Sequence, residues 1–339
     1  MKKLLSLILV LVFAFTLCAC GVEDTESASS STAGKLPAVP PMKPAYVEVG
    51  ENGSRTDDAV GFQLDLPKLN EKIAVLETNQ GTIYMRLFPE SAPIAVANFV
   101  GLVEAGYYNG LTFHRIMDNF MMQGGDPDGN GTGGTSVWNG KFEDEFNANL
   151  LNIRGSVAMA NSGRNTNGSQ FFINQCSTPV KKLEHNFSYT YNNYKSQYGD
   201  VLKQEYDSLV SQYGEEVTSL YPTADDYVRE SIRAVIAKNG FLSDIVSDEA
   251  WDIYGKVGGN IHLDGAFKEG YGGHTVFAQV FKGMSIVDKI CKVEVDSNDK
   301  PLEDVIIKKA YTTTVTEEIL ANADPVEYKA STGSEVVAP

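Results

Sequence analysis

The chain has 339 residues, of which 42% are hydrophobic and 21% charged, and its formal net charge is −16. This hydrophobic fraction provides a proper core for one large domain or two ordinary ones. The negative charge and the absence of a basic stripe exclude a protein that binds nucleic acid through the phosphate backbone.

Residues 1–19 are predicted to be a lipoprotein signal peptide. Two lysines precede the apolar run LLSLILVLVFAFTL, which is too short and wrongly flanked for a transmembrane helix. The LCAC that follows resembles a bacterial lipobox, in which Cys20 carries the lipid, with acyl chains such as palmitate, and begins the mature chain. The alternative is ordinary signal cleavage near Ala19. We therefore expect an exported protein, lipid-anchored to the extracytoplasmic face of the cell membrane.

Residues 20–45 are rich in Ser, Thr, Ala, Gly and Pro and contain almost no large apolar side chains, so they are predicted to form a flexible tether. Residues 46–71 are an N-terminal extension of uncertain structure, with a short strand expected near FQLDLP.

From residue 72 onward the pattern is mainly β. A hairpin is predicted at 73–77 and 82–87, because two β-rich runs flank the turn sequence TNQG. An amphipathic helix is expected over 89–108, with Ser91 as its N-cap, and a second over 283–293. Further short strands are predicted at 111–116, 120–125, 155–160, 169–175, 275–280 and 304–312. Short strands punctuated by glycine predict a closed or nearly closed antiparallel barrel.

Residues 177–260 are predicted to be a helical insertion between two strands. Leu202, Tyr206 and Leu209 recur at helical spacing, and Thr223 with Asp226 forms a capping pattern before a second amphipathic run. A third short helix is expected at SDEAWDIYG. Residues 313–339 are interpreted as an acidic C-terminal tail.

Several short motifs match known functional patterns only in part. The GNGTGG of 129–134 fits a dinucleotide-binding pattern, but no helix is predicted after it. The DPDGNG of 126–131 matches only the first half of a calcium loop, because Val137 occupies the twelfth position. The four histidines show no metal-ligand spacing. We therefore expect no metal and no cofactor. Cys176 and Cys291 could pair in an oxidising compartment.

Two long blocks carry a family resemblance. LTFHRIMDNFMMQGGDPDGNGTGG and VAMANSGRNTNGSQFFINQ both resemble signature blocks of the cyclophilins, which are peptidyl-prolyl cis-trans isomerases. The similarity also covers APIAVANFVGLVEAGYYNG, IHLDG, HTVFAQVFKGMSIVDKI and KPLEDVIIKKA. It implies a cyclophilin-like domain over residues 72–312, built as a closed eight-stranded antiparallel barrel capped by two helices and interrupted by the insertion.

The resemblance also implies the site. Arg115 would be the catalytic donor, with Phe120 and Gln123 beside it. The implied substrate-binding residues are Met121, Ala160, Asn161, Gln170, Phe172, His262, Leu263 and His274. The competing interpretation is barrel core for the apolar side chains, which we favour for Phe113 and Phe171, and a surface salt bridge for Arg115. His114 is interpreted as structural.

The sequence departs from the family pattern in three places. His262 stands where many members have tryptophan, which predicts weaker binding of cyclosporin-type macrocycles. Eight residues separate Gly265 from His274 where the family usually has about one. The insertion enters just before His262, where it could act as a lid, a substrate arm or a partner surface.

The leading hypothesis is a monomeric, membrane-tethered peptidyl-prolyl cis-trans isomerase that acts on Xaa-Pro bonds of exported proteins. The alternative is a membrane-tethered chaperone or adaptor that binds proline-containing segments with little catalysis. The tyrosine-rich insertion motivates this second hypothesis.

Overall fold

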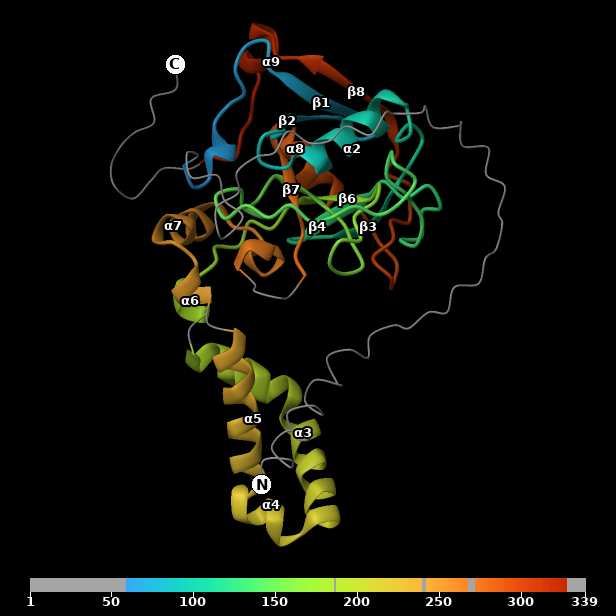
Figure 1. The fold of residues 1–339 in the computed structure, drawn as a ribbon. Helices are drawn as coiled ribbons and strands as arrows, with labels where there is room; N and C mark the ends of the chain where they lie inside the picture. Colours follow the sequence, from blue (N-terminus) through green and yellow to red (C-terminus); the bar gives the residue numbers. More distant parts are fainter. Residues whose placement is uncertain (1–58, 186, 240–241, 268–271, 328–339) are drawn as a thin grey trace. The chain divides into compact units, whose positions relative to one another are not determined.

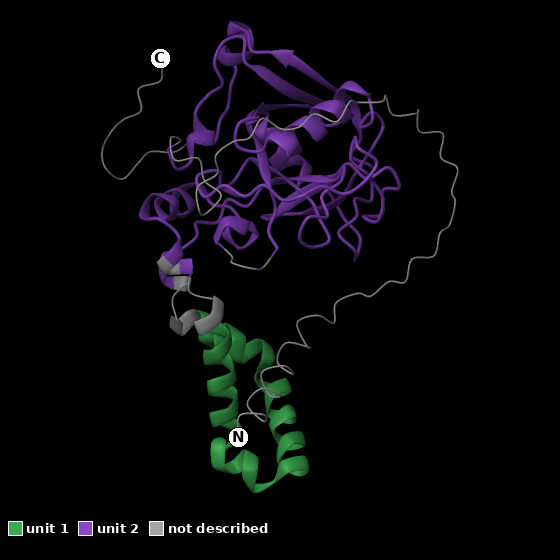
Figure 2. Ribbon diagram, in the orientation of Figure 1, with its two compact units in different colours: residues 1–33, 187–241 green, residues 34–186, 242–339 purple. Residues whose placement is uncertain are grey.

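The structure is a computed structural model that describes residues 59–327, apart from 186, 240–241 and 268–271. Among the described residues, the chain divides into two compact units: one holds those of 187–241, and the other holds those of 34–186 and 242–339 (Figure 2). The predicted signal peptide, Cys20, the tether and the end of the tail lie outside the described residues. None of the described helices is both long and apolar enough to span a bilayer.

The larger unit is built on an eight-stranded antiparallel sheet with the strand order β3-β4-β6-β5-β7-β2-β1-β8 (Figure 1). The strands are β1 (Lys72–Thr78), β2 (Thr82–Leu87), β3 (Phe113–Met117), β4 (Met121–Gly124), β5 (Ser156–Met159), β6 (Phe171–Asn174), β7 (Val276–Lys282) and β8 (Ile307–Thr314). Every strand that the sequence predicted from residue 72 onward is present, with ends that differ by a few residues. The short strand expected near FQLDLP is wrong, because Phe62–Leu64 forms a 3-10 turn, η1.

The sheet curls but does not close, so the prediction of a closed barrel is wrong. Its edge strands β3 and β8 do not pair along their length. They approach where Thr112 forms an isolated bridge with Ile306. Backbone hydrogen bonds of 2.7–2.9 Å there join Gly110, Leu111 and Phe113 to Val305 and Ile307. The result is a curled half-barrel.

Two helices pack on this half-barrel, as predicted. Helix α2 (Pro93–Glu104) contacts β7 and β8, and α8 (Met284–Ile290) contacts β2. The predicted Ser91 cap is wrong, because the N-cap of α2 is Ala92, which makes no side-chain capping bond. The Glu145 carboxylate instead accepts the N–H groups of Ile94 and Ala95, which the first turn leaves unpaired.

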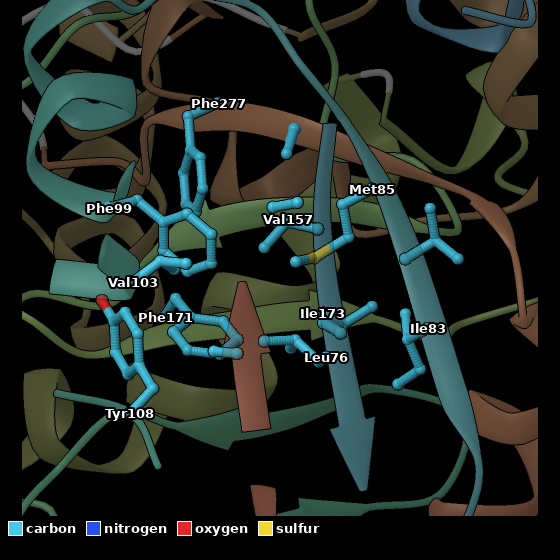
Figure 3. Packing of buried hydrophobic residues seen from close by; sticks show 14 of the residues in the cluster. Leu76, Ile83, Met85, Phe99, Val103, Tyr108, Val157, Phe171, Ile173 and Phe277 are labelled. Carbon is cyan, nitrogen blue, oxygen red and sulfur yellow. The ribbon is translucent and has the colours of Figure 1, made fainter. Parts of the chain in front are cut away.

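The main core lies between the inner face of the sheet and these helices. Phe99 of α2 is fully buried, and its ring centroid lies 5.0–5.3 Å from those of Tyr108, Phe171 and Phe277 (Figure 3). Edge-to-face and tilted rings at this distance are favourable beyond the area that they bury. Phe113 and Phe171 belong to the same cluster, which confirms their interpretation as core residues.

The smaller unit contains α3 (Phe187–Tyr213), α4 (Glu215–Leu220) and α5 (Ala224–Asn239). Helices α3 and α5 pack against each other along their length. Their shared core is aromatic and aliphatic, with Tyr206, Leu209, Val217, Tyr227, Val228, Ile232 and Ile236 buried. The predicted capping pattern is confirmed, since the Thr223 hydroxyl accepts the Asp226 N–H at 3.2 Å.

The short helices α6 (Leu242–Ile245) and α7 (Asp248–Val257) belong to the larger unit. Trp251 and Tyr254 of α7 are buried in a second core cluster with Leu151 and Ile153. After β8, helix α9 (Glu317–Ala321) begins at Thr316, whose hydroxyl accepts the Ile319 N–H. Cys176 and Cys291 are both buried and free, so they form no disulfide in this structure.

Candidate active site

The predicted site residues share one face of the sheet. Strand register places Arg115 opposite Gln123, Gln123 opposite Phe172, and Phe172 opposite Ala158. Side chains two positions apart along a strand point to the same side. The row continues to Val276, which pairs with Ala158. Four more predicted site residues lie two positions along the chain from a member of this row: Met121, Ala160, Gln170 and His274. The β pattern therefore gathers residues from five strands on one face.

This face has its own apolar cluster, separate from the main core. It contains Phe120 and four of the predicted substrate-binding residues, namely Met121, Ala160, Phe172 and Leu263. Met121 and Phe172 are 2% and 4% exposed, whereas Phe120, Ala160 and Leu263 are half-buried around them. We call these five residues the apolar cluster of the site. The neighbouring residues Ile116, Met122 and Ile173 belong to the main core instead.

Arg115 lies at the border of this cluster. Its Nη2 is 3.1 Å from the Met117 sulfur, and Met117 packs against the cluster. Its Nε lies 3.4 Å from Oδ2 of Asp299, with 42% of the Arg115 side chain and 35% of the Asp299 side chain exposed. The salt bridge that the sequence offered as an alternative is thus present, but it leaves the guanidinium half-exposed beside the apolar side chains. Asp299 was not among the predicted site residues, and 184 positions separate it from Arg115.

Gln123 and Gln170 form a bonded pair beside Arg115. Nε2 of Gln123 donates to Oε1 of Gln170 at 2.9 Å. The Gln170 amide in turn donates to the carbonyls of Gly131 and Gly133 at 3.0 and 2.8 Å. The glycine-rich stretch that resembled a nucleotide loop therefore holds the orientation of this pair.

Asn161 follows Ala160 at the end of β5 and is bonded within the protein. Its amide nitrogen donates to the Gly273 carbonyl at 2.8 Å, and Oδ1 of Asp144 lies 3.4 Å from the same atom. The backbone N–H of Ala160 donates to the Gln170 carbonyl at 3.0 Å. These bonds hold the segment that follows β5 against Gly273 and Gln170.

The two histidines of the site pack on its aromatic rings. His262 stacks on Phe120, with 6.0 Å between centroids and 15° between planes. His274 meets Phe172 edge-on at 5.2 Å, and its Nδ1 is 2.9 Å from the Met159 carbonyl oxygen. The long segment before His274 therefore does not displace it from the site. The backbone N–H of His274 donates to the Leu263 carbonyl at 2.9 Å.

His114, next to Arg115 in sequence, is 6% exposed. Neither ring nitrogen has a hydrogen-bond partner among the described residues. Burial lowers its pKa, although the nearby Asp126 opposes this shift. Over the same part of the chain there is no group of three or more His, Cys, Asp or Glu side chains placed to hold a metal ion.

Comparison with known proteins places this geometry in a family. The family model described as cyclophilin type peptidyl-prolyl cis-trans isomerase/CLD matches residues 73–213 and 253–312. A protein of Staphylococcus aureus (strain USA300), named as a proposed peptidyl-prolyl cis-trans isomerase, is 36% identical over 248 residues, which cover 71% of this chain and 95% of that protein. A Streptococcus pyogenes protein, named as a proposed bifunctional phosphatase/peptidyl-prolyl cis-trans isomerase, is 37% identical over 249 residues, or 73% of this chain and 40% of its own.

Two crystal structures of a Cryptosporidium parvum cyclophilin type peptidyl-prolyl cis-trans isomerase, one in the presence of the dipeptide Ala-Pro, have 22% identity and cover 72% of this chain. Their TM-scores are 0.45 and 0.44. The conclusion therefore rests on the family match, which spans more than half of the chain, and on the 36% identity to a relative matched over nearly its whole length. The chain belongs to the cyclophilin-type peptidyl-prolyl cis-trans isomerases.

Proposed function

We propose that this isomerase acts on Xaa-Pro bonds of exported polypeptides and that Arg115 stabilises the twisted amide without covalent chemistry. The observation that carries the proposal is the position of Arg115, half-exposed on the face of the sheet that holds the apolar cluster of the site.

The reaction needs no nucleophile or proton transfer. An amide C–N bond resists rotation with a barrier of ~18–20 kcal/mol, because the nitrogen lone pair is delocalised into the carbonyl. When the bond twists, the prolyl nitrogen becomes a pyramidal acceptor. A guanidinium beside that nitrogen binds the twisted state better than either planar state, and such differential binding is what accelerates a reaction.

The neighbours of Arg115 suit this task. Met121, Phe172 and Leu263 would hold the proline ring, because they form an apolar surface from three separate elements. Asn161, with the backbone of Ala160, would hold the residue before proline, so that rotation occurs against a fixed chain. Apolar side chains also exclude water, which strengthens a charge–lone pair contact.

We further propose that the protein is lipid-anchored through Cys20 on the extracytoplasmic face of the cell membrane. Support comes from the lipobox-like LCAC after an apolar signal run and from the tether-like composition of residues 20–45. Mass spectrometry of the membrane fraction tests this proposal: we expect an acylated N-terminal Cys20, and Cys20→Ala should release the protein from the membrane.

The catalytic proposal is tested by isomerisation of an Xaa-Pro peptide. Arg115→Ala should bring the rate close to the uncatalysed value, and Arg115→Lys should retain only part of it, because lysine lacks the planar fork of donors. Arg229→Ala is the matched control, since Arg229 is a surface residue of the smaller unit. Equal rates for wild type and Arg115→Ala would refute the role of Arg115.

A second candidate function, client binding by the smaller unit, is favoured by a specific feature of α3. Tyr198 and Val201 are 43% and 46% exposed, and the rings of Tyr194 and Tyr198 lie 5.8 Å apart. Removal of residues 187–241 separates the two functions better than a longer deletion, because α7 belongs to the core of the larger unit. Loss of aggregation suppression with peptide turnover retained would support client binding, and unchanged suppression would contradict it.

A further inference from the structure

A buried carboxylate lies directly behind the apolar cluster of the site. Asp264 follows Leu263 in sequence and is 4% exposed. Its Oδ1 accepts the backbone N–H of Asn152 at 2.9 Å and the side-chain amide of Asn152 at 2.6 Å. A buried carboxylate needs such donors, since an unsatisfied one is strongly unfavourable. The two donor groups of Asn152 therefore fix the position of the Asp264 carboxylate.

Tyr254 of α7 supplies a further donor. Its hydroxyl donates to Oδ2 of Asp264, and the whole side chain is inaccessible to solvent. Burial raises the pKa of Tyr254 well above its usual value, and the Asp264 carboxylate adds to this shift, so the phenol stays a donor over the physiological range. The helix that carries Tyr254 lies outside the sheet but inside the same compact unit.

The connection from α7 to Asp264 is short and closely packed. Gly259 forms an isolated bridge with Ile153, and a Cβ at Gly259 would lie 2.5 Å from the Ile153 Cα. The following Asn260 donates from its side chain to Asn174 at 2.7 Å and to the Phe120 carbonyl at 3.2 Å. Residues 259 and 260, which lead to the site residues His262 and Leu263, are therefore held by Ile153, Asn174 and the Phe120 backbone.

The same network reaches the residues that face the substrate. The side-chain amide of Asn152, which bonds Asp264, lies 3.2 Å from the His274 carbonyl oxygen. His274 in turn donates its backbone N–H to Leu263. A displacement of Asp264 would therefore move both Leu263, which belongs to the apolar cluster, and His274, whose ring meets Phe172.

We infer that Tyr254 is a positioning residue: through Asp264 it holds the His262–Leu263 wall and His274 in the geometry that binds the proline segment. This inference rests on the proposed function of the site. It also gives α7, the helix that follows the smaller unit in the chain, a role in substrate binding without any contact to substrate.

The kinetic consequence differs from that of a catalytic residue. The wall contacts the substrate in its planar and twisted states alike, so a looser wall weakens both complexes equally. Such a change raises KM and leaves kcat nearly unchanged. Removal of the Arg115 donor, by contrast, lowers kcat.

The experiment compares the full chain with Tyr254→Phe and with Tyr206→Phe as matched control. Tyr206 is also buried and donates its hydroxyl to the Tyr221 carbonyl at 2.9 Å, but it lies in the smaller unit. For Tyr254→Phe we expect KM, and the Kd of an Ala-Pro-containing peptide, to rise about threefold to tenfold while kcat stays within about twofold. The imidazole NMR signals of His262 and His274 should shift in Tyr254→Phe and not in Tyr206→Phe.

The results that overturn the inference are distinct from those that overturn the proposed function. Wild-type KM, Kd and imidazole signals in Tyr254→Phe would leave Tyr254 a purely structural residue, even if the unfolding midpoint fell. A lower kcat with unchanged KM would assign it to the chemical step instead. Asp264→Asn, which keeps the size of the side chain, should reproduce the rise in KM. An inactive wild type would refute the proposed function, and peptide Kd together with the NMR signals would still decide the role of Tyr254.

Discussion

The carboxyl group of Glu145 predicts a pH dependence of stability that can be traced to one residue. It accepts the N–H groups of Ile94 and Ala95 at 3.0 and 2.8 Å, at the N-terminus of α2. Burial raises its pKa to about 7; these two hydrogen bonds oppose the shift, and the Glu143 charge adds to it. The folded protein therefore holds a proton on Glu145 at pH values where the unfolded chain has released it.

This difference in proton binding determines whether the free energy of unfolding rises or falls with pH. The ordinary pKa of the group is 4.5, so between pH 4.5 and 7 the folded state binds more protons than the unfolded state. The stabilisation is fully present below pH 4.5 and is lost as pH rises through 7. A difference of about 2.5 pKa units corresponds to at most ~3 kcal/mol in the free energy of unfolding.

Urea unfolding from pH 4.5 to 8 tests this prediction. Tryptophan fluorescence reports on the larger unit alone, because both tryptophans of the chain, Trp138 and Trp251, lie there. Glu145→Gln keeps an acceptor for only one of the two N–H groups, but it cannot titrate, so its stability relative to wild type should rise by up to ~3 kcal/mol between pH 4.5 and pH 8. Glu303→Gln, at an exposed position, should parallel wild type at every pH. Parallel curves for Glu145→Gln and wild type would refute the reasoning.

Two further predictions concern the core and the rim of the site. Phe99→Ala should lower the free energy of unfolding by about 3–5 kcal/mol, since it empties the space between three other rings. Phe99→Leu should lower it less. In urea unfolding, a loss below about 1 kcal/mol for the alanine variant would contradict this packing argument. A cyclosporin-type macrocycle should bind weakly to wild type and more tightly to His262→Trp, because the larger ring would extend the surface that now stacks on Phe120; tight binding to wild type in a titration would contradict it.

Local patterns in the sequence were sufficient for the eight strands of the sheet and for α2, α7 and α8, but they predicted a strand at η1 and missed α6 and α9. Alternation and turn residues identify a strand from its own residues, and apolar spacing identifies a helix in the same way. Closure of the sheet is different, because it depends on whether two edge strands far apart in sequence pair. The cap of α2 was missed for the same reason: Ser91 is the local candidate, whereas the actual acceptor, Glu145, lies about 50 residues away.

For the candidate site too, the residues could be predicted from the sequence but the long-range contacts that hold them could not. Its sheet residues were named from the resemblance of two contiguous blocks to the cyclophilins, and the observed register places these residues on one face. The contacts that hold these residues join positions far apart in the sequence, so no local pattern predicts them. Asp299 reaches Arg115 across 184 positions, and Asn260 reaches the Phe120 carbonyl across 140. The Tyr254–Asp264 bond spans only 10 residues, but no local pattern marks a buried phenol as the partner of a carboxylate.

The contacts of Arg115 bear directly on the proposed mechanism. Its ion pair with Asp299 has an Nε–Oδ2 distance of 3.4 Å and partners that are 42% and 35% exposed, so it contributes at most about 1 kcal/mol. Among the described residues, its other hydrogen-bond contact is to the Met117 sulfur, which is a weak acceptor. Exchanging these contacts for a prolyl nitrogen therefore costs less than about tenfold in rate. A guanidinium held this loosely at the edge of an apolar cluster remains available for an acceptor that exists only while the amide is twisted.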